Sequence, residues 1–297
     1  MNRYDGFSDC HPAVNFLFFV GAIGFGVVIQ HPAYVLAGLV CAAAYAVCLS
    51  GKGAWKLLAG LLPLLAVLTL VNPLLNTQGS RVLATVFGRP YTLEALLYGG
   101  AIAGILAVTV LWFHCFHLVL TSDKFISLFG SRIPALSLLL VMVLRLVPHF
   151  LGKARQILGA RQAIGRGMSR EDGLRQKVTD GGAVLSVLTS WALEGGVVTA
   201  DSMRSRGYGT GRRTAFQVYR MTGRDMALLM LMGLLAAGTL ISAASGGVSA
   251  SFTPVMALAP VTGRYGWGLG CYTAFLLIPT ALHWKETMQW NISKSKI

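Results

Sequence analysis

Long uncharged stretches alternate with short polar ones along this 297-residue chain. The uncharged stretches cover residues 14–29, 33–49, 57–75, 95–120, 226–244 and 266–282. A helix needs roughly 20 apolar residues to cross a bilayer, with a range of about 17–25. Five of the six stretches meet or approach that length, and 14–29 is marginal. The pattern therefore predicts an all-α, polytopic membrane helical bundle.

The first apolar stretch lacks the pattern of a cleavable signal peptide. Asp5 and Asp9 precede it, no small-residue cleavage site follows it, and Gln30-His31-Pro32 leads directly into the next apolar stretch. We therefore expect this stretch to remain in the membrane.

Two further helices of mixed character are predicted between the fourth and fifth stretches. The first runs from about residue 136 toward 164, and Gly165 ends it, because glycine is favoured just past a helix C-terminus. Its apolar start, 134–144, is short and indicates a helix that leaves the membrane or lies at its surface. The second runs from about 183 to 206, is apolar at first and polar after Glu194, and ends before glycine 207.

Charge is scarce and unevenly placed. Only 12% of the residues are charged, about half of what soluble domains carry, so most of the surface is expected to face lipid. The net charge is +14, and residues 145–224 hold fourteen basic and five acidic residues. Basic loops stay on the cytoplasmic side, so this segment is predicted to be cytoplasmic. The charge also favours anionic lipid headgroups, whereas the absence of a binding motif argues against nucleic acid.

The same rule predicts the topology of the spans in the plasma membrane. Lys52 and Lys56 place the turn after the second span inside, and the first two spans then form a hairpin with the N-terminus inside. Residues 76–93 become an external loop, and Lys285 places the C-terminal end inside.

Motifs for catalysis are missing from the sequence. No phosphate-binding loop is present, since Gly152-Lys153 is followed by alanine, and no metalloprotease or serine-hydrolase motif occurs. His114 and His117 share one helical face, but no third metal ligand lies near, so hydrogen bonding across helices is favoured over a metal site. The five cysteines are scattered and indicate small hydrophobic packing residues.

The end of the second mixed helix carries the candidate site. Asp201 and Arg204 lie three residues apart and can pair, while Arg206 lies in the last turn, where a cation offsets the helix dipole. Glu194 is an acid in an apolar setting and is expected to pair with an arginine of this segment. An arginine beside Gly207 at a helix end can enter a groove on another protein and form forked bonds to a carboxylate.

The stretch "TSWALEGGVVTADSMRSRGYG", residues 189–209, resembles the coupling segment of the transmembrane T component of energy-coupling factor (ECF) transporters, the cobalt-transporter Q-type family. The family's signature is a helix end of the form small residue, Arg, Gly, here Ser205-Arg206-Gly207. Further stretches resemble the same family, so the likeness covers nearly the whole chain: 11–16, 72–76, 121–130, 144–148 and 211–216.

A second such helix end, usually Ala-Arg-Gly, occurs in the family, and "ARQAIG", residues 160–165, matches it in two ways. Ala160-Arg161 keeps the first two residues but is followed by Gln162. Ala163-Ile164-Gly165 keeps the outer residues but has isoleucine in place of arginine. Arg161 is the residue expected to contact the second partner.

The resemblance implies three parts: transmembrane helices in 1–133, a cytoplasmic coupling-helix module in 134–224, and C-terminal transmembrane helices with a short tail in 225–297. It implies a non-catalytic scaffold that binds two ABC-type ATPase subunits and a substrate-binding S component, and so imports a vitamin or transition-metal ion. ATP would bind the partners, and no cofactor is expected on this chain. The alternative is a membrane lipid-modifying transferase with a basic cytoplasmic face.

Overall fold

The computed structural model describes residues 6–76, 79, 81–86, 89–121, 124–125, 127–128, 134–165, 173–211, 219–251, 257–258 and 266–294. The chain divides into two compact units. The first, the bundle unit, comprises Met1–Phe125 and Tyr219–Ile297, and the second, the two-helix unit, comprises Ile126–Val218.

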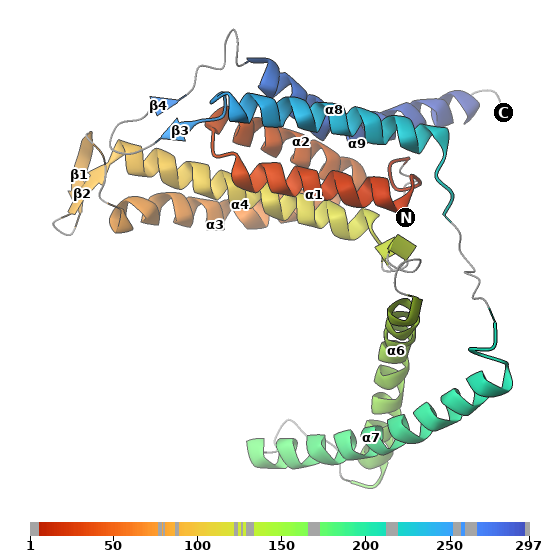
Figure 1. Ribbon diagram of the computed structural model, residues 1–297. Helices are drawn as coiled ribbons and strands as arrows, with labels where there is room; N and C mark the ends of the chain where they lie inside the picture. Colours follow the sequence, from red (N-terminus) through yellow and green to blue (C-terminus); the bar gives the residue numbers. More distant parts are fainter. Residues whose placement is uncertain are drawn as a thin grey trace. The chain divides into compact units, whose positions relative to one another are not determined.

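The bundle unit is built from long helices that lie side by side (Figure 1). Its helices are α1 (Pro12–Val28), α2 (Pro32–Ser50), α3 (Lys52–Leu75), α4 (Leu93–Val119), α8 (Gly223–Ala244) and α9 (Gly266–Lys294). Each of the six apolar stretches predicted from the sequence falls within or almost within one of these helices, so the all-α prediction is confirmed.

Strands are confined, in the described residues, to two short antiparallel hairpins. One pairs β1 (Val82–Val86) with β2 (Arg89–Thr92), and the other pairs β3 (Ala250–Ser251) with β4 (Ala257–Leu258). The first hairpin occupies much of the segment expected as an external loop.

In the part of the chain that the structure describes, five helices are long and apolar enough to cross a membrane: α2, α3, α4, α8 and α7 (Leu174–Ser205). With 17 residues, α1 is shorter. The presence of α7 among the five follows from the apolar stretch in its middle, residues 183–193, which the sequence also indicated.

The first two helices begin in the same way. His11 and His31 each precede a proline at the first helical position, and each imidazole Nδ1 accepts a hydrogen bond from the backbone N–H two residues on, at 3.1 and 3.3 Å. Proline fits this position because the first N–H groups of a helix have no intrahelical acceptor.

The helix ends of the bundle unit are joined by polar contacts. The N–H of His11 donates to Asp225 at the start of α8, at 3.2 Å, and the hydroxyl of Ser50 lies 3.3 Å from Nε2 of His114. Arg224 pairs with Glu286 of α9 at 3.3 Å. One end of the bundle therefore gathers the starts of α1, α3 and α8 with the ends of α2, α4 and α9, as the predicted up-and-down topology requires.

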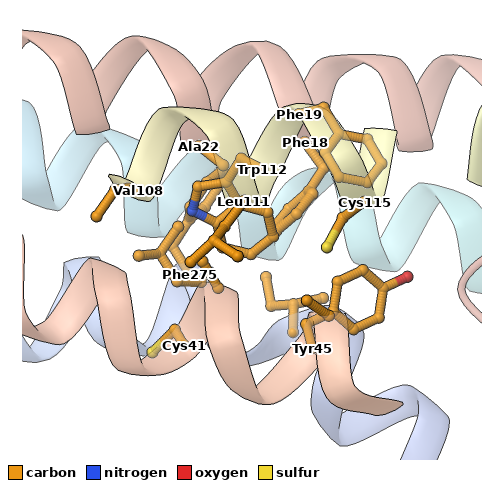
Figure 2. Close-up of a cluster of buried hydrophobic side chains, with 14 of the residues drawn as sticks. Phe18, Phe19, Ala22, Cys41, Tyr45, Val108, Leu111, Trp112, Cys115 and Phe275 are labelled. Atoms are coloured by element: carbon orange, nitrogen blue, oxygen red, sulfur yellow. The ribbon is translucent and has the colours of Figure 1, made fainter. Parts of the chain in front are cut away.

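Aromatic rings form the centre of the bundle unit (Figure 2). The ring of Phe18 stacks on Phe275 at 5.2 Å and meets Trp112 edge-on at 5.5 Å, while Tyr45 lies 6.2 Å from Trp112. Such ring pairs stabilise a core beyond their buried area. Cys41 and Cys115 are buried in the same cluster, which confirms that they act as small hydrophobic packing residues.

The two-helix unit contains α6 (Pro134–Ala163) and α7, which pack against each other. The predicted bounds of α6 are confirmed to within two residues. The prediction for α7 is wrong at its start, because the helix begins at Leu174 rather than 183. The helix continues through the glycine pair 181–182, and Asp180 one residue earlier forms an ion pair with Arg161 of α6.

Candidate functional site at two glycine-capped helix ends

The C-terminus of α7 is closed by a Schellman cap, a pair of backbone hydrogen bonds around a left-handed residue. Gly207 has a φ of 73°. Its N–H donates to the carbonyl of Arg204 at 2.9 Å, and the N–H of Tyr208 donates to the carbonyl of Met203 at 3.0 Å. Arg206 occupies the cap position between helix and turn. The cap therefore holds the backbone of Arg206 in one geometry.

Two side-chain hydroxyls form further hydrogen bonds to backbone carbonyls at the same end of α7. Ser205 Oγ donates to the carbonyl of Ser202 at 3.0 Å, and Thr210 Oγ1 donates to the carbonyl of Gly207 at 2.7 Å. The side chain of Arg206 is exposed and forms no ion pair with any described residue. A rigid backbone thus presents a free guanidinium at the end of the helix.

The C-terminus of α6 shows the left-handed glycine and one of these two cap hydrogen bonds. Gly165 has a φ of 75°, and its N–H donates to the carbonyl of Gln162 at 3.0 Å. Ile164 consequently holds the position that Arg206 holds on α7, and Ala163 corresponds to Ser205. Of the two registers left open by the sequence, this geometry favours Ala163-Ile164-Gly165.

Arg161 lies one turn before that end and is held within the two-helix unit. Its guanidinium pairs with Asp180 of α7 at 2.5 Å, with side-chain exposures of 21% and 9%. Gln176 donates a second hydrogen bond to this carboxylate at 3.4 Å. The neighbouring Ala160 is exposed. A direct contact between Arg161 and a partner protein stays a prediction, while its contact with α7 is in the structure.

The pairs expected around the end of α7 do not form among the described residues. Asp201 and Arg204 are both exposed and make no ion pair. Glu194 is also exposed on α7, without the arginine partner that the sequence suggested. Exposed pairs one turn apart contribute only a few tenths of a kcal/mol, so solvation of both groups competes with pairing.

A second contact between α6 and α7 surrounds Trp191. The rings of His149 and Phe150 lie 4.9 and 5.6 Å from the indole, and Lys153 Nζ is 5.4 Å from its centroid. Trp191 pairs with residues near 150 and Asp180 pairs with Arg161, so the helices run antiparallel. Two contacts about 16 Å apart along α7 fix one helix against the other.

The antiparallel packing places the two capped ends at opposite ends of the helix pair. Arg206 lies fifteen residues beyond Trp191, and Ile164 lies three residues beyond Arg161. At 1.5 Å per residue, the path along the two helix axes from one capped end to the other is roughly 40 Å. Two separate proteins, or two subunits of one partner, can therefore be contacted at once.

Of the two histidines of α4, His114 makes the contact across helices that was favoured from the sequence, and the described contacts show none of this kind for His117. His114 bonds to Ser50 of α2, and His117 is exposed beside the ring of Phe116. No group of three potential metal ligands occurs among the residues that the structure describes.

Sequence reasoning missed three residues that organise the structure. Asp180 and Trp191 join α6 to α7, and Asp225 joins α8 to the start of α1. Only Asp225 had a local signal, because Thr222 three residues before it forms a capping box with it. The partners of the other two lie far away in the chain, and no spacing rule identifies them.

The apolar bundle and the basic two-helix unit with its exposed ends define the class: a multi-pass protein of the plasma membrane. A family model described as CbiQ, cobalt transport protein, matches residues 8–217. The chain belongs to this family, that of the T components of ECF transporters, and is therefore the membrane component of a multi-subunit transporter. No curated protein matches the chain. The matched range includes both capped ends.

Proposed function

We propose that the chain is the coupling subunit of an ATP-driven ECF-type importer. It binds two ABC-type ATPase subunits and transmits their movement to a substrate-binding S component, which carries a vitamin or a transition-metal ion. The exposed Arg206 on the rigid cap of α7 is the observation on which this proposal depends most. ATP is bound and hydrolysed by the partner subunits, and the present chain supplies the mechanical connection.

The two-helix unit has the properties of a lever. With 32 residues, α7 is about 48 Å long, and a helix of this length passes a displacement from one end to the other. The Schellman cap keeps Arg206 from moving independently of the helix. The contacts at Trp191 and at Asp180 make α6 follow α7, so a push at one capped end reaches both helices.

The chemistry of the end of α7 fits an acidic groove. A guanidinium forms two parallel hydrogen bonds to one carboxylate. Most other side chains at position 206 could not form this pair of bonds. Ser205 and Gly207 on either side are small, which lets the backbone approach the groove closely. The cap gives Arg206 a fixed starting direction, so less conformational entropy is lost on docking.

ATP-dependent substrate uptake tests the proposal. Arg206→Glu replaces the cation with an anion in the groove and is expected to abolish uptake while the protein still inserts in the membrane. Arg175→Glu is the matched control, because it makes the same change on an exposed position in the first turn of the same helix. Uptake at the wild-type rate by the Arg206→Glu variant would overturn the proposal.

A further inference from the structure

A polar cavity lies at the end of the bundle unit where α1 and α8 begin. It has a volume of about 280 Å³, and its charged lining residues are Asp9, Arg220, Arg224 and Asp225, with His11 beside them. Small-molecule sites have volumes of about 300–1,000 Å³, so this cavity suits a small polar group rather than a large cofactor.

Two of the four charged groups already have partners within the chain. Asp225 is buried, and its carboxylate accepts hydrogen bonds from the N–H and the hydroxyl of Thr222 and from the N–H of His11, at 2.9, 2.7 and 3.2 Å. Arg224 pairs with Glu286 at 3.3 Å. Neither of these two charges therefore requires a ligand.

The other two charged groups, Asp9 and Arg220, are uncommitted. Both side chains are exposed, and neither forms an ion pair with any residue that the structure describes. His11 adds a neutral donor, because its Nδ1 accepts from the N–H of Ala13 and the neutral ring then carries its proton on Nε2. No described residue accepts a hydrogen bond from this Nε2. The cavity thus offers one cation, one anion and one neutral N–H donor.

We infer that this cavity binds a lipid headgroup that carries both a phosphate and a primary ammonium group, as in phosphatidylethanolamine. Arg220 and His11 donate hydrogen bonds to the phosphate, and the carboxylate of Asp9 accepts from the ammonium group. A headgroup with a phosphate and no ammonium group would instead bring a second negative charge close to Asp9.

The position of the cavity favours a lipid over a soluble phosphate compound. No charged residue occurs in α1, and none occurs in α8 after Asp225, so the hydrocarbon layer begins close to the cavity. The lining residues come from the segment before α1 and from the segment that enters α8. A bound headgroup therefore joins these two segments, in addition to the hydrogen bond from His11 to Asp225. This role is independent of any ATPase partner.

Binding of short-chain lipids to the purified full-length chain in a non-ionic detergent provides the test. Phosphatidylethanolamine is expected to bind about fivefold more tightly than phosphatidylglycerol, because one exposed charge contact distinguishes the two. Asp9→Asn should remove this preference, and Arg220→Gln should weaken binding of both lipids roughly fivefold. Lys56→Gln is the control, since it removes a cation from an exposed position near the start of α3, outside the cavity.

Three results would contradict the inference. If the wild type binds the two lipids equally, or if the preference survives in Asp9→Asn, the ammonium group does not contact Asp9. Unchanged lipid binding in Arg220→Gln would show that the lipid binds elsewhere. Inorganic phosphate and phosphorylethanolamine distinguish the source of the phosphate: we expect neither to displace the lipid at equal concentration, and displacement by either one would show that the ligand is soluble.

Discussion

Gly207 has a φ of 73°, a conformation that costs a residue with a Cβ atom about 1–2 kcal/mol. An added Cβ would also lie 3.2 Å from Thr210 Oγ1, whose hydroxyl bonds to the carbonyl of Gly207. The glycine is therefore required for the cap and, through the cap, for the position of Arg206. At the residue scale, the backbone conformation of Gly207 thus determines where the charge of Arg206 is presented.

Replacing this glycine should loosen the end of α7. In Gly207→Ala we expect hydrogen–deuterium exchange of the backbone N–H groups at 207 and 208 to accelerate roughly fivefold, which corresponds to about 1 kcal/mol. Gly196→Ala is the control, because Gly196 is helical and an added Cβ would meet nothing within 4 Å. Unchanged exchange in Gly207→Ala would contradict the role of the cap.

Between elements, α3 and α4 approach each other closely at Gly99. A Cβ there would lie 2.8 Å from Cβ of Asn72 and 2.9 Å from the carbonyl oxygen of Thr69. Gly99→Ala is expected to push the helices apart, at a cost of about 1–3 kcal/mol, and to lower the thermal midpoint in detergent. Gly60→Ala, where an added Cβ on α3 meets nothing within 4 Å, should leave the midpoint unchanged or slightly raised. Equal midpoints for the two variants would refute this packing.

The ion pair between α6 and α7 gives a second test at this scale. Arg161→Asp and Asp180→Arg each place like charges together and are expected to destabilise the helix pair by roughly 1–3 kcal/mol, with reduced uptake. The double variant restores the pair in reverse and should recover most of the uptake. If Arg161 instead anchors an ATPase, the double variant will stay inactive, and this outcome would contradict the intramolecular role.

The sequence predicts elements of this protein better than it predicts their contacts. The apolar stretches and the two terminal glycines define most helices, because span length and left-handed caps depend on residues close in the chain. The start of α7 escaped prediction, since the ion pair of Arg161 with Asp180 stabilises the glycine-containing first turns across nineteen residues. The sequence also could not decide which residues of "ARQAIG" match the signature at the end of α6, because the stretch fits in two ways. The positive φ of Gly165 favours Ala163-Ile164-Gly165.

At the scale of the whole molecule, the gathered helix ends of the bundle unit predict the membrane topology. The end with Lys52, Arg224 and Lys285 is expected in the cytoplasm, and the β1–β2 hairpin outside. In a cysteine-free variant, a membrane-impermeant maleimide should label Leu83→Cys in intact cells, because Leu83 is 57% exposed in β1. Ser202→Cys on α7 should react only after permeabilisation. The reverse pattern of labelling would contradict this orientation.

The central claim is that this cobalt-transport family member couples separate ATPases to transport. The most direct measurement is the subunit composition of the complex that copurifies with the tagged chain from its native membranes. We predict two ATPase subunits for each wild-type chain and a marked loss of ATPase from Arg206→Glu, with Arg175→Glu unchanged. A wild-type chain that purifies without any ATPase, or an Arg206→Glu chain that keeps the full complement, would contradict the claim.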